Sequence, residues 1–148
     1  MKTKREFYRL VEEICQKDRR YKVDAYEFLM EALYFTQSRL KRKGHVKGVE
    51  LTEGLRDFAV KKYGPMARTV LAHWGITNTR DFGNIVFNMI DKQLLSKTDD
   101  DSIEDFNDVY DFDKAFEKVV RQSIIDALKK KKKDYERQYS KGFGYWHW

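Results

Sequence analysis

Apolar residues recur every three or four positions along most of this chain, and this spacing limits the fold more than any other feature. Such a period is typical of amphipathic α-helices, whereas a half-buried strand would alternate at every second residue. In residues 4–18 the apolar side is formed by Phe7, Leu10, Val11, Ile14 and Cys15. The sequence therefore predicts a mainly α-helical, single-domain bundle of about six helices.

A second helix is expected to start near Asp24, with Glu27 three residues later in the arrangement of a capping box. One apolar side of this helix includes Leu29, and Phe28 lies on a second apolar side. A helix that is apolar on two sides belongs in the middle of a bundle. The segment that follows, residues 38–48, contains two glycines and a cluster of basic side chains, so we expect an exposed loop there.

Glycine, proline and a polar cap mark the next helix boundaries. A helix over residues 51–63 should end at Gly64, with Pro65 opening the next helix. Asn78 or Thr79 is then expected to cap a further long helix.

The last long helix is expected to begin near Asp111 or Asp113. Its apolar positions, which we expect to belong to the core, run as far as Leu128, and the same spacing continues to Tyr135 and Tyr139. The five consecutive lysines that follow Leu128 are therefore expected to lie on a helix rather than in a loose linker.

Length and composition indicate one domain without covalent cross-links. The 148 residues suffice for a real hydrophobic core, and we divide them into a helical domain, residues 1–128, and a basic, aromatic extension, residues 129–148. The single cysteine, Cys15, excludes an internal disulfide and a cysteine-based zinc site. No apolar run approaches the roughly 18 residues of a membrane span, and the basic N-terminus lacks an apolar signal region, so we expect no membrane contact and a cytoplasmic protein.

The net charge of +6 hides a strong segregation along the chain. Residues 1–48 carry 13 Lys and Arg against 7 Asp and Glu, and residues 118–148 carry 9 against 3. Residues 99–117, by contrast, carry 1 against 9. A polyanion would therefore meet the basic ends and avoid the acidic segment.

The acidic segment allows two local structures. Ser102, followed by Asp105, can cap a short helix that reaches Phe106. Alternatively, a small β-hairpin can form within residues 95–110, and the order helix, turn, helix, hairpin is that of a winged helix-turn-helix. The spacing does not fit an EF-hand, whose loop requires a glycine at its sixth position.

In the winged-helix alternative the recognition helix would be formed by residues 79–95. Its candidate exposed side chains are Arg80, Asp81, Asn84, Asn88 and Lys92. Because the wing would be acidic, DNA phosphates would repel it, and such a fold would contact protein instead.

Several stretches resemble an uncharacterised family of hypothetical bacterial proteins of the planctomycete and verrucomicrobial type. The resemblance covers roughly residues 18–117 and rests mainly on GPMARTVLAHWG and EDFNDVYDF. It implies a small bacterial protein with no assigned catalytic residues, so it transfers no site to this chain.

Catalytic and metal-binding patterns are not evident in the sequence. Cys15 lies on the apolar side of the first helix, which is typical of a buried structural cysteine. The three histidines, His45, His73 and His147, lie far apart in the sequence, whereas a zinc site needs about three or four converging ligands. We therefore expect a protein that is not an enzyme and that needs no cofactor and no metal.

The basic ends of the chain carry the functional prediction. Lysines can each neutralise a phosphate and aromatic rings can stack on unpaired bases, a combination found in single-stranded nucleic-acid binding. The candidate binding residues are Lys129, Lys130, Lys131, Lys132, Lys133, Tyr135, Arg137, Tyr139, Lys141, Phe143, Tyr145, Trp146, Trp148, Arg39, Lys41, Arg42 and Lys43.

Three roles of the C-terminal extension remain open at this point. It can bind RNA or a ribonucleoprotein, pack its aromatic side chains on the body of the protein, or dock in a groove of another protein. The first role predicts a non-enzymatic binding protein for RNA or a ribonucleoprotein. The last role predicts a protein–protein adaptor with a winged-helix-like body and an aromatic tail.

Overall fold

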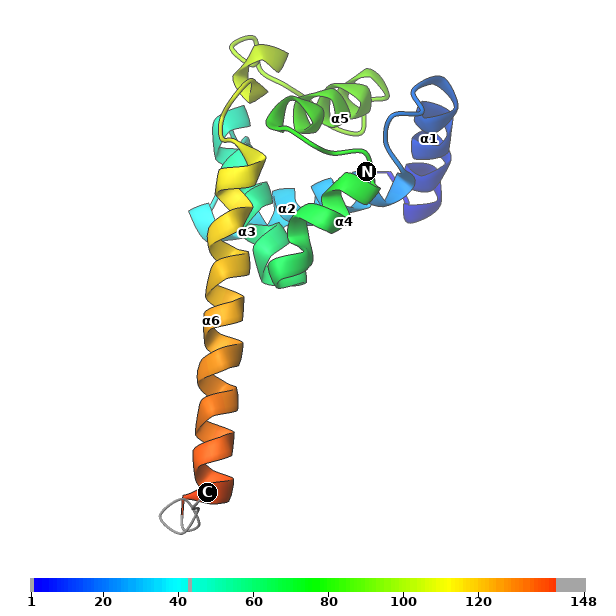
Figure 1. The fold of residues 1–148 in the computed structure, drawn as a ribbon. Helices are drawn as coiled ribbons and strands as arrows, with labels where there is room; N and C mark the ends of the chain where they lie inside the picture. Colours follow the sequence, from blue (N-terminus) through cyan, green and yellow to red (C-terminus); the bar gives the residue numbers. More distant parts are fainter. Residues whose placement is uncertain (1, 43, 141–148) are drawn as a thin grey trace.

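A computed structural model of the protein describes residues 2–42 and 44–140 and shows a helical body from which one long helix projects (Figure 1). The α-helices are α1 (Lys4–Lys17), α2 (Val23–Leu40), α3 (Gly48–Tyr63), α4 (Ala67–His73), α5 (Thr79–Asp91) and α6 (Phe112–Tyr139). Two short 3₁₀ helices, η1 (Gly64–Met66) and η2 (Ile103–Phe106), join them. The candidate residues Lys43, Lys141, Phe143, Tyr145, Trp146 and Trp148, and also His147, lie outside the described residues.

The mainly α fold class is confirmed, but the predicted number of helices and the possible hairpin are not. Five helices have 13 residues or more, whereas α4 has only 7, so a bundle of about six comparable helices is not supported. No strand occurs within the described part of the chain, so the alternative of a winged-helix hairpin within residues 95–110 is wrong.

Helix α2 lies in the middle of the body, as its two apolar sides predict. It buries side chains around its circumference and packs against α1, α3 and α5. The Phe28 ring contacts Phe58 and Trp74, with ring centroids 5.4 and 5.5 Å apart. This aromatic cluster joins α2 to α3 and to the end of α4.

The helix boundaries follow local capping. Asn78 caps α5 by accepting from the Asp81 backbone N–H at 3.0 Å, and Asp111 caps α6 in the same way. Helix α2 begins one residue before Asp24 without a side-chain cap, so the expected capping box is not used. Helix α5 ends at Asp91, four residues earlier than predicted.

The acidic segment adopts the first of its two predicted structures. Ser102 and Asp105 form a capping box at the start of η2, and Phe106 is buried between α3 and α5. A β-carbon at Gly83 of α5 would lie 2.9 Å from the Phe106 side chain, so the glycine lets η2 approach the helix closely. The capping box satisfies backbone hydrogen bonds at the start of η2, and Phe106 packs in the core. These contacts stabilise the segment without a hairpin.

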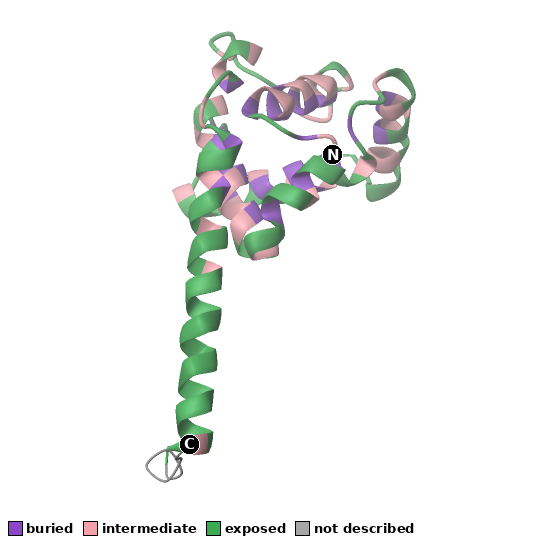
Figure 2. Cartoon of the chain, viewed as in Figure 1, coloured by how far each residue is buried: buried purple, intermediate pink, exposed green. Residues whose placement is uncertain are grey.

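Helix α6 is anchored to the body only near its start. Phe112 and Phe116 are buried against the body, where Phe112 contacts Phe82 of α5 with ring centroids 5.8 Å apart. Beyond Ser123, which is partly buried, nearly every residue of the helix is exposed (Figures 1 and 2). The prediction that its apolar positions as far as Leu128 belong to the core is therefore wrong.

Candidate functional site

The lysine run lies on the part of α6 that leaves the body. Residues 129–133 are helical and exposed, which confirms the prediction that they continue the helix (Figure 2). At 1.5 Å per residue, about 24 Å of helix separates Ser123 from Tyr139. The five ammonium groups are thus held beyond the body, on a rigid element.

None of these five lysines has a hydrogen bond or an ion pair with the described residues. Successive residues turn by about 100° around a helix axis, so five consecutive lysines cannot share one side. Lys129, Lys130, Lys133 and Arg137 fall within an arc of about 100°, and we call this group the basic face. Lys131 and Lys132 point to other sides of the helix.

The rings of the two tyrosines of this helix contact each other at a tilt of 44°. The Tyr135 and Tyr139 ring centroids are 4.7 Å apart, and Tyr135 remains 52% exposed. By the same helical geometry they lie on the side of α6 opposite the basic face. The tyrosines therefore share their side of α6 with Lys131 and Lys132, which flank them, and not with the basic face.

A row of aliphatic side chains on α6 is also uncovered. Val120, Ile124 and Leu128 are 39%, 55% and 62% exposed, and we call them the exposed stripe. Their spacing of four residues places them within an arc of about 80°, on the side of the axis opposite the basic face. Sequence reasoning placed this stripe in the core, because periodicity shows which side of a helix is apolar but not what covers it.

The length of α6 was the signal that could have revealed the stripe. Its 28 residues span about 42 Å, whereas the next longest helix, α2, has 18 residues and spans about 27 Å. A helix this much longer than its neighbours extends beyond the body it packs against.

In the second predicted basic cluster, at the end of α2, both arginines form ion pairs within the body. Arg39 pairs with Asp57 of α3 at 2.6 Å, and Arg42 pairs with Glu50 at 2.8 Å. Lys41 ends α2 in a left-handed conformation with a φ of 56°. In Figure 1 this end of α2 lies beside the body, far from the last turns of α6, so the two basic clusters do not form one surface.

The side chains expected on a recognition helix face inward instead. Asn88 of α5 donates to Asp18 at 3.0 Å and to the Tyr26 hydroxyl at 3.1 Å. Asn84 donates to the Tyr21 hydroxyl at 2.9 Å, and that hydroxyl donates to Asp81. These bonds tie α5 to the start of α2 and to the loop before it, so this side of α5 offers no surface for reading DNA.

Two further candidates on the predicted recognition helix, Arg80 and Lys92, are also paired. Arg80 donates to Asn107 at 2.8 Å, and Lys92 pairs with Glu13 of α1 at 3.2 Å. Burial raises the pKa of the Tyr26 hydroxyl to about 12, despite the opposing hydrogen bond from Asn88. All five residues are partly buried rather than fully exposed, although the Arg80 side chain keeps 40% of its surface in solvent, and their contacts pack α5 on its neighbours.

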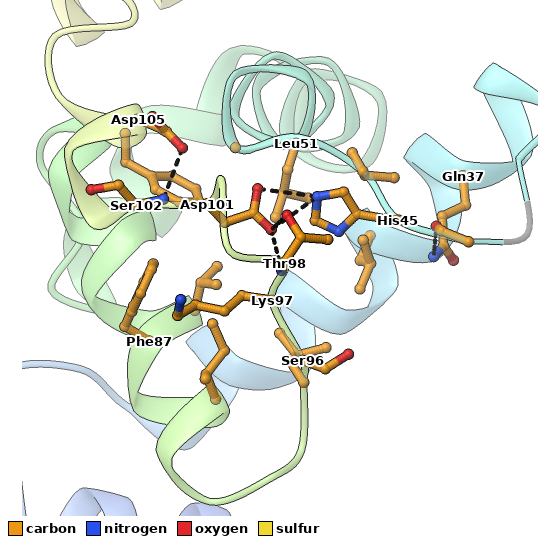
Figure 3. Close-up of a pocket in the computed structure, with 18 residues that line it drawn as sticks. Gln37, His45, Leu51, Phe87, Ser96, Lys97, Thr98, Asp101, Ser102 and Asp105 are labelled. Atoms are coloured by element: carbon orange, nitrogen blue, oxygen red, sulfur yellow. Dashed lines mark hydrogen bonds and ion pairs between the residues drawn. The ribbon is translucent and has the colours of Figure 1, made fainter.

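A pocket of about 320 Å³ lies between the acidic segment, α5 and the loop before α3 (Figure 3). Its floor is apolar and includes Leu51 and Phe87, whereas its rim carries polar side chains. His45 pairs there with Asp101 at 3.0 Å, although the loop before α3 was expected to be simply exposed. This contact holds the acidic segment against the body.

The polar side chains around the pocket are hydrogen-bonded within the acidic segment and to His45. Burial would raise the pKa of Asp101, but hydrogen bonds from Thr98 and the nearby His45 outweigh it, and the pKa lies below its usual value. The Ser102 hydroxyl bonds to Glu104 at 2.8 Å and not to His45. Covalent catalysis by a nucleophile–base pair needs the two groups within hydrogen-bond reach, and among the described residues the ring of His45 bonds only to Asp101.

The other side chains of the body that carry reactive groups, Cys15 and His73, make contacts within the fold. Cys15 is partly buried, and its thiol contacts the Tyr21 carbonyl oxygen at 3.7 Å. Burial raises the pKa of this thiol, which leaves it poorly nucleophilic. His73 lies 3.1 Å from the Lys22 ammonium. Among residues 2–42 and 44–140, no group of three or more His, Cys, Asp or Glu side chains is placed to hold a metal ion.

Comparisons with protein-family models, with curated proteins and with solved structures find no match for this chain. In the described part of the chain, every helix is too short or too polar to cross a membrane.

Proposed function

We propose that the protein is a non-enzymatic cytoplasmic binding protein that contacts RNA or a ribonucleoprotein through the basic end of α6. The observation that carries this proposal is the lysine run on a projecting helix, unpaired among the described residues. Each lysine or arginine on the basic face can neutralise one phosphate and release its counterions.

The acidic segment lies too far away to cancel this charge. Glu117, the last residue of the acidic segment, and Lys129 are 12 residues apart on α6, which corresponds to about 18 Å along the helix axis. The Debye length at physiological ionic strength is about 8 Å, so repulsion between the acidic segment and a bound phosphate backbone is strongly screened. Because the tyrosines lie on the other side of α6, the proposal rests on phosphate contacts and not on base stacking.

The salt dependence of binding tests this proposal. Four side chains on the basic face, each neutralising one phosphate of a single strand, give a logarithmic slope of about −2.8. Affinity for a fluorescent single-stranded RNA, measured by anisotropy, should therefore fall about 50-fold between 50 and 200 mM salt. The loss should be equal for RNAs of different sequence, since phosphate contacts carry no base information.

A matched pair of variants locates the site. Lys129→Gln, Lys130→Gln and Lys133→Gln together should leave a slope of about −0.7, because one cation of the basic face remains. Replacing Lys2, Lys4 and Lys17 by Gln removes the same charge from exposed positions of the body and should leave the slope unchanged. Equal weakening by both sets, or no RNA binding at 50 mM salt, would contradict the proposal.

A protein–protein adaptor is the second candidate, and the exposed stripe is the observation that favours it. Contiguous apolar side chains on a projecting helix are typical of a helix that docks on a partner. The docking element in this alternative is α6 itself, without the winged-helix-like body. A complex with a protein that forms equally at 50 and 200 mM salt would support it over RNA binding.

A further inference from the structure

The exposed stripe leaves three branched aliphatic side chains in water on one side of α6. Val120, Ile124 and Leu128 follow one another at intervals of four residues, so they form a nearly straight row along the helix. Figure 2 shows α6 largely exposed along the part that extends beyond the body. Scattered apolar side chains are ordinary on a protein surface, but a contiguous row on an isolated helix indicates a contact surface.

We propose that this stripe pairs with the same stripe of a second copy of the chain, with the two α6 helices antiparallel and a two-fold axis beside Ile124. The row is symmetric about that residue, with an aliphatic side chain four positions before it and another four positions after it. In the antiparallel pair, Ile124 meets Ile124 and Leu128 meets Val120 of the second copy. Such self-complementarity is what an isologous two-fold interface requires.

The distribution of charge along the chain selects the antiparallel arrangement. Residues 99–117 carry 1 Lys or Arg against 9 Asp and Glu, whereas residues 118–148 carry 9 against 3. Parallel helices, with axes about 8–10 Å apart, would place two runs of five lysines side by side. Antiparallel helices bring the basic end of each copy to the acidic segment of the other, and Lys131 opposite Glu117.

The second copy leaves the other two sides of α6 undisturbed, namely the side that packs on the body and the basic face. Phe112 and Phe116, which hold α6 on the body, lie about 100° around the axis from the exposed stripe, so a second helix can approach without displacing the body. The basic face lies on the opposite side of α6 and stays accessible in the pair. The proposal therefore stands whether or not the protein binds RNA.

Sedimentation equilibrium of the full chain from about 1 to 500 µM tests self-association, since an interface this small predicts a weak dimer. The wild-type protein should shift from monomer towards dimer across this range. Ile124→Glu should abolish the shift, because it places a charge at the centre of the interface. Gln122→Glu adds the same charge to another side of the same helix and should dimerise as the wild type does.

Disulfide trapping then tests the orientation, in a Cys15→Ala background. Oxidation of a mixture of Val120→Cys and Leu128→Cys proteins should give mainly the mixed disulfide dimer, because only the antiparallel pair brings these two positions together. Like-with-like dimers in excess would overturn the antiparallel arrangement. A monomer at every concentration, or equal behaviour of Ile124→Glu and Gln122→Glu, would overturn self-association and assign the stripe to a different partner.

Discussion

Replacement of Phe116 by alanine tests how α6 is attached to the body, on which both proposals depend. Phe116 is 2% exposed, and its ring packs edge-to-face on Phe112 with centroids 5.4 Å apart. Removing a buried phenylalanine side chain typically costs about 3–5 kcal/mol, which is a large fraction of the stability of a small domain. Phe116→Ala should therefore lower the free energy of unfolding by about that amount.

Ile124→Ala is the matched control on the same helix. Ile124 is 55% exposed and lies two turns beyond Phe116, so its replacement should change the free energy of unfolding by less than about 0.5 kcal/mol. Deletion of residues 129–148 should change the free energy of unfolding equally little, because the buried part of α6 ends well before Lys129. The deletion also leaves Trp74, which is buried, as the single tryptophan of the chain.

Urea unfolding, followed by far-UV circular dichroism and by tryptophan fluorescence, measures these changes. A protein concentration of about 1 µM keeps self-association from contributing to the apparent stability. The slope of the transition should be equal in the wild type and both point variants, so that a change of midpoint reports stability alone. A cost of Ile124→Ala similar to that of Phe116→Ala would show that the far half of α6 packs on the body, and would refute the reasoning.

Two further predictions concern the body. Gly54→Ala should lower the thermal midpoint, because the new β-carbon would lie 1.9 Å from the Thr36 hydroxyl and overpacking costs about 1–3 kcal/mol; in a Thr36→Ala background the cost should be smaller, because only the β-carbon of residue 36, at 2.9 Å, remains as a close contact. A cost unchanged by Thr36→Ala would contradict the contact. The Arg20 guanidinium holds the pKa of Asp18 far below its usual value, so the carboxylate stabilises the fold above about pH 4, the unfolded pKa, and less as the pH falls below it. Asp18→Asn should therefore be less stable than the wild type at pH 7 in urea unfolding, with a difference that shrinks towards pH 2; a difference independent of pH would exclude this source of stability.

Local sequence signals were sufficient for most helices and their ends. The spacing of Val11 and Ile14 predicts α1, the polar caps Asn78 and Asp111 mark the starts of α5 and α6, and Ser102 predicts η2 as one of two alternatives. These signals are reliable because a cap or an amphipathic side depends on residues within one or two turns. The lysine run was placed on a helix by the same local argument.

The candidate site could be predicted only in part, since exposure is a property of the whole fold. The side chains Asn84 and Asn88 are polar and were expected to face solvent, but Tyr21, Tyr26 and Asp18 arrive from distant parts of the chain and bind them. Conversely, Ile124 and Leu128 are apolar and were expected in the core, but no part of the body reaches them.

The sequence by itself determined which long segments are helical, where most of them begin, and which side of each helix is apolar. It also determined that the acidic and basic charges occupy separate parts of the chain. Only the tertiary structure decided that α6 leaves the body after its first turns, which turns a predicted core stripe into an uncovered one and holds the lysines away from the acidic segment. The physical reason is that periodicity reports contacts within a helix, whereas the neighbour that covers each side comes from elsewhere in the chain.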